Sequence, residues 1–314
     1  MLPKPPPREP SLGFLYLPPF RVQGASIAGE STSIQVPELD VVFDMGCCPR
    51  TMLASKYAVI SHGHMDHIGS LAYWCSQRKF QGMGAGTIIC DARIERAIRR
   101  MMEGYVELEQ QVTPFEVIAL NPDGEAEIKN NTVIRAFEVE HTGPAFGYVI
   151  IEKRSKLKPE YADLPQESLR EIKARGEEIT RILEIPLVAY LGDTAPGPAL
   201  LRADVRTAQI VISECTFVEP DHKSRAKIGK HLHLDDIVEW LRVLECKHLV
   251  LTHLSRRTNI AFARKQLAQQ AGRDRSARVE FLMDSRPNKE RYERQLLEAA
   301  EKEAQRTAQT PRAG

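Results

Sequence analysis

Residues 61–70 read SHGHMDHIGS and place three histidines and one aspartate between His62 and His67. The whole chain of 314 residues has only nine histidines, so a third of them stand in this one stretch. An ordinary surface loop or buried strand has no use for such a cluster. A metal site does, because neutral imidazoles and a carboxylate are ligands that suit zinc, manganese or iron.

The segment just before the cluster, YAVIS (57–61), has the length and the β-branched content of a strand. Because alternate side chains of an extended chain point the same way, His62 and His64 can face one side at the end of that strand. Asp66 and His67 then stand at the turn into a predicted helix. Four ligand-type groups so close in sequence serve one tetrahedral ion poorly, and two ions about 3.5–4 Å apart would use them better.

Other predicted strands supply the further ligands that two ions need. Four apolar, strand-length runs are each followed by a potential ligand or supporting carboxylate: Asp44 in VVFDMG, His141 in EVEHTGP, Asp193 in VAYLGDTAPG and His253 in LVLTHLS. Four separate strands that all end in this way are hard to obtain by accident. Two adjacent ions held there would supply a nucleophile at neutral pH and act as Lewis acids toward a phosphoryl or carbonyl oxygen.

Helical patterns alternate with the strand-length runs, for example at 91–104, 234–245 and 262–272. The first begins with a capping-type aspartate and ends at a glycine. Because no internal repeat is visible, this mixture predicts one layered α/β domain. The predicted divisions are a flexible proline-rich lead (1–12), a main domain (13–285) with a charged arm (152–184), and a charged C-terminal helix or tail (286–314).

Composition narrows the classes of function. The formal net charge is +1, so only a local basic patch could attract nucleic acid. No apolar run approaches the roughly 18 residues that cross a bilayer, and the proline-rich start lacks the apolar core of a secretory signal. The six cysteines show no CxxC pattern, which favours reduced thiols in a cytoplasmic protein.

The stretch HGHMDH (62–67) has the HxHxDH pattern of the metallo-β-lactamase superfamily. Together with the four strand-end residues, it resembles all five motifs of that superfamily. The resemblance covers about residues 25–285 and implies an αββα four-layer sandwich with two metal ions at one edge of the packed sheets. It also implies roles for single residues: His62, His64 and His141 would bind one ion, Asp66, His67 and His253 the other, Asp193 would bridge them, and Asp44 would orient a ligand histidine from behind.

Within the superfamily the chain resembles ribonuclease Z, the tRNA 3′-end endonuclease. The stretches that carry this likeness are FEVEHTGPAFGY (137–148), LGDTAPG (191–197), ISECTF (212–217), KHLHLDDIVEW (230–240) and LTHLSRR (251–257). In that family a histidine outside the metal site is catalytic. His231 matches it better, and His233 is its rival.

The resemblance to ribonuclease Z implies a reaction and its components. The expected reaction is endonucleolytic cleavage of a phosphodiester bond in RNA, at the 3′ end of a precursor tRNA. Two zinc ions are expected, with manganese or iron as alternatives. Asp66 would orient the nucleophile, and His231 would act as a cation or as a proton donor to the leaving oxygen. Relatives in this family tend to be dimers, so a homodimer is expected.

Two basic runs are candidates for contact with RNA. KRSKLK (153–158) and KSRAK (223–227) would both flank the metal edge in the implied fold, where they could contact an RNA backbone. Such runs are more often solvated faces of a protein.

Other functions stay open. The chain has GCCPR (46–50) where ribonuclease Z usually has a Gly-Glu-Gly-Thr-Gln-like stretch, and its arm lacks the long glycine- and proline-rich tRNA-binding segment. These differences fit a small-molecule hydrolase of the same fold, acting on a thioester, lactone or cyclic phosphodiester. A non-catalytic RNA-binding relative is a third reading, but the intact ligand set argues against it.

Overall fold

Two seven-stranded β-sheets pack face to face in the computed structural model, which describes residues 2–309. The first sheet is built in chain order, with antiparallel strands at its start and parallel strands from the fourth onward. Its strands are β1 (Gly13–Leu17), β2 (Phe20–Ile27), β3 (Ser31–Val36), β4 (Val41–Phe43), β5 (Tyr57–Val59), β6 (Gly86–Asp91) and β7 (Phe115–Leu120).

The second sheet has the same arrangement, because its antiparallel strands come first in the chain and its parallel strands last. Its strands are β8 (Glu125–Lys129), β9 (Thr132–Glu138), β10 (Phe146–Leu157), β11 (Thr180–Tyr190), β12 (Ile210–Glu214), β13 (His248–Thr252) and β14 (Val279–Phe281). The two halves of the chain therefore build similar sheets, and each presents a row of parallel strands whose carboxyl ends meet at one edge.

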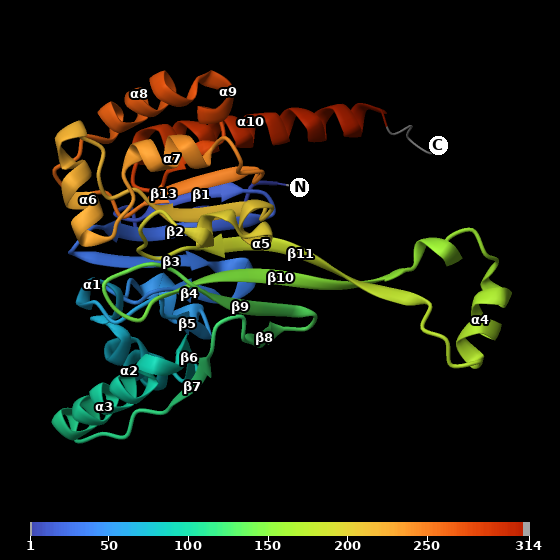
Figure 1. Cartoon of the computed structure of the whole chain (residues 1–314), viewed down its shortest axis with the longest axis horizontal. Helices are drawn as coiled ribbons and strands as arrows, with labels where there is room; N and C mark the ends of the chain where they lie inside the picture. The colour runs from blue at the N-terminus through green and yellow to red at the C-terminus, as the bar shows by residue number, and fades with distance from the viewer. Residues whose placement is uncertain (1, 310–314) are drawn as a thin grey trace.

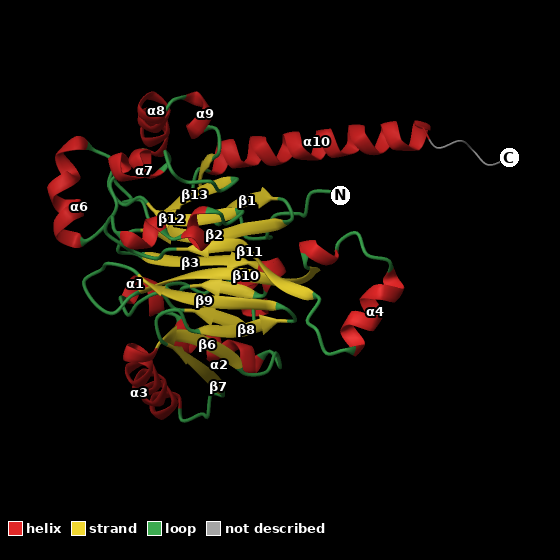
Figure 2. Cartoon of the chain, turned by 45° about the vertical axis from the view of Figure 1, so that its right-hand side comes forward, coloured by secondary structure: helices red, strands yellow, loops and turns green. Residues whose placement is uncertain are grey.

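Helices cover the outer faces of both sheets (Figures 1 and 2). Within residues 2–309 the α-helices are α1 (Met65–Ile68), α2 (Leu71–Phe80), α3 (Ala92–Glu109), α4 (Gln166–Ala174), α5 (Ala203–Arg206), α6 (Lys223–Gly229), α7 (Leu234–Trp240), α8 (Ile260–Ala271), α9 (Arg273–Ser276) and α10 (Ser285–Gln309). The helices α2 and α3 lie on the first sheet, and α7 and α8 on the second. The predicted αββα four-layer sandwich is confirmed.

Three apolar clusters form the core, one in each gap between layers. The first joins the two sheets and includes Phe43, Tyr148 and Tyr190, none of which is exposed beyond 2%. A second cluster lies under α7 and α8, and a third under α2 and α3 around Trp74. Because parallel strands are covered on both faces, β5 and β12 are buried along their whole length. The strand ends next to these clusters are correspondingly rigid.

The charged arm grows out of two of these strands. β10 and β11 continue past the sheet edge as a paired ladder in which Leu157 lies opposite Thr180, and α4 sits at the tip. Figure 1 shows the arm projecting from the end of the sandwich opposite α1 and α6. The basic run 153–158 lies on this ladder, so the prediction that it flanks the metal edge is wrong; a strand rises about 3.3 Å per residue and carries it away.

The proline-rich lead and the start of α10 both contact the body of the sandwich. In the proline-rich lead, expected to be flexible, Lys4 pairs with Glu38, and Glu9 accepts a hydrogen bond from the backbone of Thr51. The tail forms α10, whose Tyr292 packs edge-on against Phe14 at 5.4 Å. Residues 310–314 of the predicted tail lie outside the described range. Among residues 2–309, no helix combines the length and the apolar character needed to cross a membrane.

Candidate metal centre

The candidate residues meet at the edge where the carboxyl ends of the parallel strands converge. Asp44 follows β4, the HGHMDH stretch follows β5, and Asp193 and His253 follow β11 and β13. His141 lies in the turn between β9 and β10, on the same edge. The ligand-type atoms fall into overlapping groups, and within each group they lie within 4.8 Å of one another.

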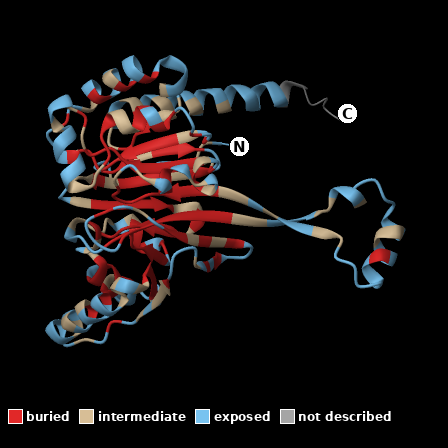
Figure 3. Cartoon of the chain, in the orientation of Figure 1, coloured by how far each residue is buried: buried red, intermediate tan, exposed pale blue. Residues whose placement is uncertain are grey.

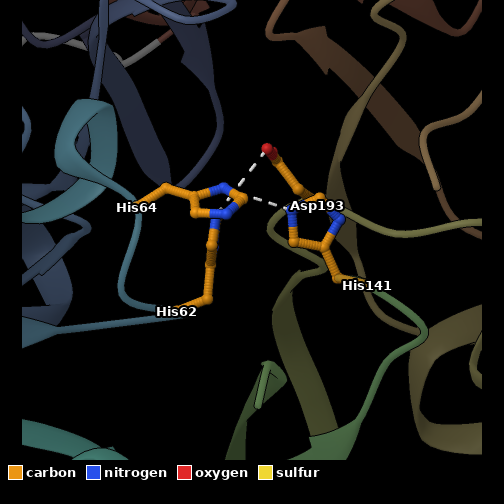
Figure 4. A group of neighbouring side chains, drawn as sticks. All are labelled: His62, His64, His141 and Asp193. Atoms are coloured by element: carbon orange, nitrogen blue, oxygen red, sulfur yellow. Dashed lines mark hydrogen bonds and ion pairs between the residues drawn. The ribbon is translucent and has the colours of Figure 1, made fainter. Parts of the chain in front are cut away.

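The first group contains His62, His64, His141 and Asp193 (Figure 4). His141 Nε2 lies 3.3 Å from His64 Nδ1, and His62 Nε2 lies 3.9 Å from Asp193 Oδ2. The side chains come from three separate segments and point toward one another. The three imidazoles and one carboxylate form a compact donor set of the kind that binds a divalent transition metal.

The second group contains Asp66, His67 and His253. Its Nε2 atoms, from His67 and His253, lie 3.3 Å apart, and Asp66 Oδ2 is 3.6 Å and 3.4 Å from them respectively. The backbone N–H of Gly29 donates a hydrogen bond of 2.9 Å to the same Asp66 oxygen, which fixes the carboxylate from the outer side.

Asp193 stands between the two groups. Its Oδ2 atom lies 3.4 Å from Nε2 of both His67 and His253, and it also approaches His62 of the first group. Burial opposes a charge on this carboxyl, but the imidazoles of His253 and His67 hold its pKa well below the usual range. A buried carboxylate in this place can serve two ions at once.

Hydrogen bonds behind the histidines aim their inner nitrogens at the centre. His67 Nδ1 lies 2.7 Å from Asp44 Oδ2, His253 Nδ1 lies 2.9 Å from Thr216 Oγ1, and His141 Nδ1 lies 3.2 Å from the carbonyl of Lys230. Donation of each Nδ1 proton outward leaves the Nε2 lone pair facing inward. This arrangement is common behind metal-binding histidines.

Asp44 is completely buried, and donors surround its carboxylate. The backbone N–H and the hydroxyl of Ser61 donate at 2.7 Å and 2.8 Å, and the Tyr190 hydroxyl donates at 2.5 Å. Asp44 itself has a φ of 57°, a left-handed conformation that aspartate tolerates better than most residues. Its carboxylate is therefore fixed against His67.

These residues fit metal ions on two observations. His62 Nε2 is buried without a hydrogen-bond partner among residues 2–309, and burial, with the neighbouring His67, lowers the pKa of His62 to about 2. A neutral ring with an unused lone pair pointing into a polar centre can donate that pair to a metal ion. In addition, the carboxylates of Asp44 and Asp193 are buried and Asp66 is partly exposed beside them, and a cation would compensate the negative charge that they gather.

The two rival histidines, His231 and His233, have different surroundings in the structure. The His231 ring lies beside the cluster, with its centroid 5.2 Å from that of His141 and 5.6 Å from that of His253. His233 instead caps α7: its Nδ1 accepts from the backbone of Asp235, and its Nε2 lies 3.0 Å from the carbonyl of Glu219. Both ring nitrogens of His233 are thus engaged in local structure.

Comparison with known proteins places this geometry in a family. A profile described as a beta-lactamase superfamily domain matches residues 48–162. The chain is 33% identical over 250 residues to a chloroplastic tRNase Z of Arabidopsis thaliana, and the alignment covers 77% of this chain and 69% of that protein. It is 31% identical over 244 residues to a second Arabidopsis tRNase Z, covering 77% and 87% respectively. The chain belongs to the tRNase Z family.

Solved structures agree with this assignment at the level of the fold. The metallo-beta-lactamase fold protein YhfI from Bacillus subtilis superposes with a TM-score of 0.59 at 14% identity, covering 86% of this chain and 95% of that one. The short form of human tRNase Z superposes with a TM-score of 0.53 at 18% identity, covering 78% and 93%. The predicted membership is confirmed: this tRNase Z relative is a metallo-hydrolase that uses divalent metal ions.

One charged residue of this tRNase Z centre was not predicted from the sequence. Glu214 is 1% exposed at the end of β12, and its carboxylate oxygens lie 3.0 Å and 3.1 Å from His231 Nδ1. It also accepts a hydrogen bond of 2.7 Å from the backbone of Thr194, next to Asp193. Its place at the end of an apolar strand, as for Asp44, is the signal that could have found it.

Proposed function

We propose that the protein is an endoribonuclease that cleaves a phosphodiester bond in 3′-extended precursor tRNA, with two zinc ions as cofactors. The observation that carries this proposal is the double cluster with Asp193 between its halves and His231 at its side. Support for RNA as the substrate comes from the relatives named tRNase Z. Their likeness covers most of the chain.

The metal ions would be held by the two groups described above. His62, His64 and His141 would hold one ion, Asp66, His67 and His253 the other, and Asp193 would contact both. When bound, such a pair supplies a nucleophile at neutral pH and polarises the phosphoryl group. Three imidazoles around one ion favour zinc over magnesium or calcium.

His231 is suited to act on the leaving oxygen. Burial opposes its charge, but the hydrogen bond from His231 Nδ1 to Glu214 and the charge of that carboxylate raise the pKa of His231 above its usual value. The raised pKa favours the protonated ring, and its Nε2 is left to face a substrate. Donation of that proton to the departing oxygen is general acid catalysis, and Glu214 stabilises the charged ring until the transfer.

Asp66 would position the attacking oxygen as well as bind a metal ion. The Gly29 N–H holds Asp66 Oδ2, so the side chain is not free to turn away. Replacing Asp66 with alanine should abolish turnover while the fold remains intact. Wild-type turnover in Asp66→Ala, with near-UV and far-UV circular dichroism unchanged, would contradict the two-metal assignment.

The decisive experiment compares two substrates with purified protein whose metal content is counted by mass spectrometry. One is a 3′-extended precursor tRNA, and the other is bis(p-nitrophenyl) phosphate. Cleavage of both, with the tRNA cut near the end of its acceptor stem and both activities lost in His64→Ala, supports the proposal. Cleavage of the small diester alone assigns the centre to a small-molecule hydrolase, and a metal other than zinc in the active protein corrects the cofactor.

The expected homodimer and cytoplasmic location are part of the same proposal. Light scattering of the purified chain tests the first, and fractionation of the source cells tests the second. A monomer that cleaves precursor tRNA at full rate would show that one chain supplies the complete site.

A further inference from the structure

A cleft of 460 Å³ opens beside the metal centre, and its lining residue Phe217 lies next to His231. Its walls are Phe217 and His222, three arginines (Arg225, Arg256 and Arg257), and Glu30 with Glu219. We infer that this cleft is a stacking subsite for one unpaired RNA base next to the scissile phosphate. The inference rests on the proposed function, and it names the residues that would read the substrate beside the cut.

Phe217 is fixed close to the reacting centre. Its ring centroid lies 6.1 Å from that of His231, which in turn contacts the metal cluster. The carbonyl of Phe217 accepts a hydrogen bond of 2.9 Å from the backbone of Leu234, and its N–H donates to the carbonyl of Leu232 at 3.4 Å. The ring is half-buried, so a rigid aromatic surface stands one side chain away from the metal ligands.

Arg225 and His222 complete the stacking surface. The guanidinium carbon of Arg225 lies 5.6 Å from the Phe217 ring centroid, and the His222 ring lies 5.8 Å from it. Arg225 Nη1 lies 3.4 Å from His222 Nε2, and among residues 2–309 no carboxylate pairs with Arg225. An aromatic ring beside a planar cation whose charge is not neutralised is the combination that holds a base and its phosphate.

The opposite wall is tied to the metal centre. Glu30 forms an ion pair through both oxygens with Arg256, which bridges the β2–β3 turn and the loop after β13. Gly29, the neighbour of Glu30, is the residue that donates to Asp66. The lining of the cleft therefore adjoins Asp66 through Gly29 and His231 through Phe217. The net charge of the lining is positive, because it has three arginines and only two glutamates. Of these glutamates, Glu30 pairs with Arg256, and Glu219 pairs with His222.

The shape favours an unpaired nucleotide over a duplex. A base inside an A-form helix is stacked on both faces and cannot present a face to Phe217, whereas an unpaired base can turn out onto an aromatic or guanidinium plane. Stacking of this kind accepts every base. The site would thus select substrates by a single-stranded nucleotide at the cut, where a stem passes into a 3′ extension, and not by base identity.

A cycle of base removal and mutation tests the inference. Precursor tRNAs that carry an abasic ribose on the 5′ or the 3′ side of the cut are compared with the intact substrate, using wild-type protein and Phe217→Leu. We expect one abasic position to lower wild-type kcat/KM by about tenfold or more, and Phe217→Leu to lose a similar factor on intact RNA. The two losses should not add, because each removes the same stack.

Controls separate this role from a structural one. Phe80→Leu changes an exposed phenylalanine at the end of α2 and should match wild type on every substrate. Arg225→Gln should raise KM for RNA and flatten its salt dependence, whereas Arg242→Gln, in a surface pair with Glu239, should not.

Two outcomes overturn the subsite. One is additive losses from base removal and Phe217→Leu. The other is an equal loss on RNA and on bis(p-nitrophenyl) phosphate, which would mean that Phe217 acts through His231. Failure of the wild type to cut any precursor RNA would instead overturn the proposed function, and the subsite with it.

Discussion

β10 and β11 join two unlike regions of the molecule, the metal edge and the arm. At the metal edge, Phe146 begins β10 with its N–H bonded to Ser61, and the residues up to Ile151 are all buried. At the arm end the same strand is exposed (Figure 3), and its charges pair along the surface, as Lys153 does with Glu125. Two strands thus pass from a close-packed interior to solvent within twelve residues.

The difference shows what holds each region in place. At the metal edge, side chains are fixed by packing and by hydrogen bonds behind them, so a change of one atom is felt at the centre. In the arm, the backbone ladder holds the chain, and exposed ion pairs add little, about 0–1 kcal/mol each. Substitutions at the first region should therefore alter catalysis and metal binding, and changes in the second should leave both nearly untouched.

The largest effect expected from a side chain that is not assigned as a metal ligand is at His231. His231→Gln should lower cleavage of RNA by about 10²–10⁴-fold, because it removes the proton donor. His233→Gln is the matched control: loss of a helix cap should reduce the free energy of unfolding by about 1 kcal/mol, with cleavage close to wild type. Rates under saturating substrate and urea denaturation of both variants provide the measurement. A greater loss of cleavage in His233→Gln than in His231→Gln would reverse the assignment.

A smaller effect, on metal affinity, is expected at Tyr190, which contacts the candidate ligand His67 only through Asp44. Tyr190→Phe removes the hydroxyl that donates to Asp44, and so loosens His67. Zinc affinity should fall by about 10–100-fold, measured by competition with a chelator.

Tyr148 provides the comparison, because its buried hydroxyl donates to the carbonyl of Ile60 and not to a metal-centre carboxylate. Tyr148→Phe should cost about 1 kcal/mol of unfolding free energy and leave zinc affinity unchanged. Equal zinc affinities in the two variants would show that Asp44 does not need the Tyr190 hydroxyl to hold His67.

The metal edge could be predicted from the sequence because its residues obey a local rule. His62, His141, Asp193 and His253 each come within a few positions of the end of a buried, β-branched run. The carboxyl ends of such strands meet at one edge, so order along the chain is enough to bring distant residues together. The αββα layers follow from the same alternation of strands and helices.

Features set by three-dimensional contacts could not be predicted in this way. The choice between His231 and His233 depends on which of them caps α7, and only the folded chain shows that His233 does. Glu214 stands at the end of a buried strand, as the local rule requires, but its contact with His231 could not be predicted from spacing. The run 153–158 was expected at the metal edge on the basis of the implied fold. The direction in which β10 extends, which carries the run along the arm, could not be predicted. Sequence spacing does not contain that direction.

The smallest effect is expected from removing the arm. Leu157 and Thr180 lie opposite each other in the ladder, so an Asn-Gly turn can replace residues 158–179 and close a regular hairpin. None of the removed residues belongs to the metal groups. Bound metal and hydrolysis of bis(p-nitrophenyl) phosphate should stay within about twofold of wild type, since distant sites act independently. If the shortened protein loses metal or diesterase activity, the arm stabilises the far end of the sheet, and the contrast between the two regions does not hold.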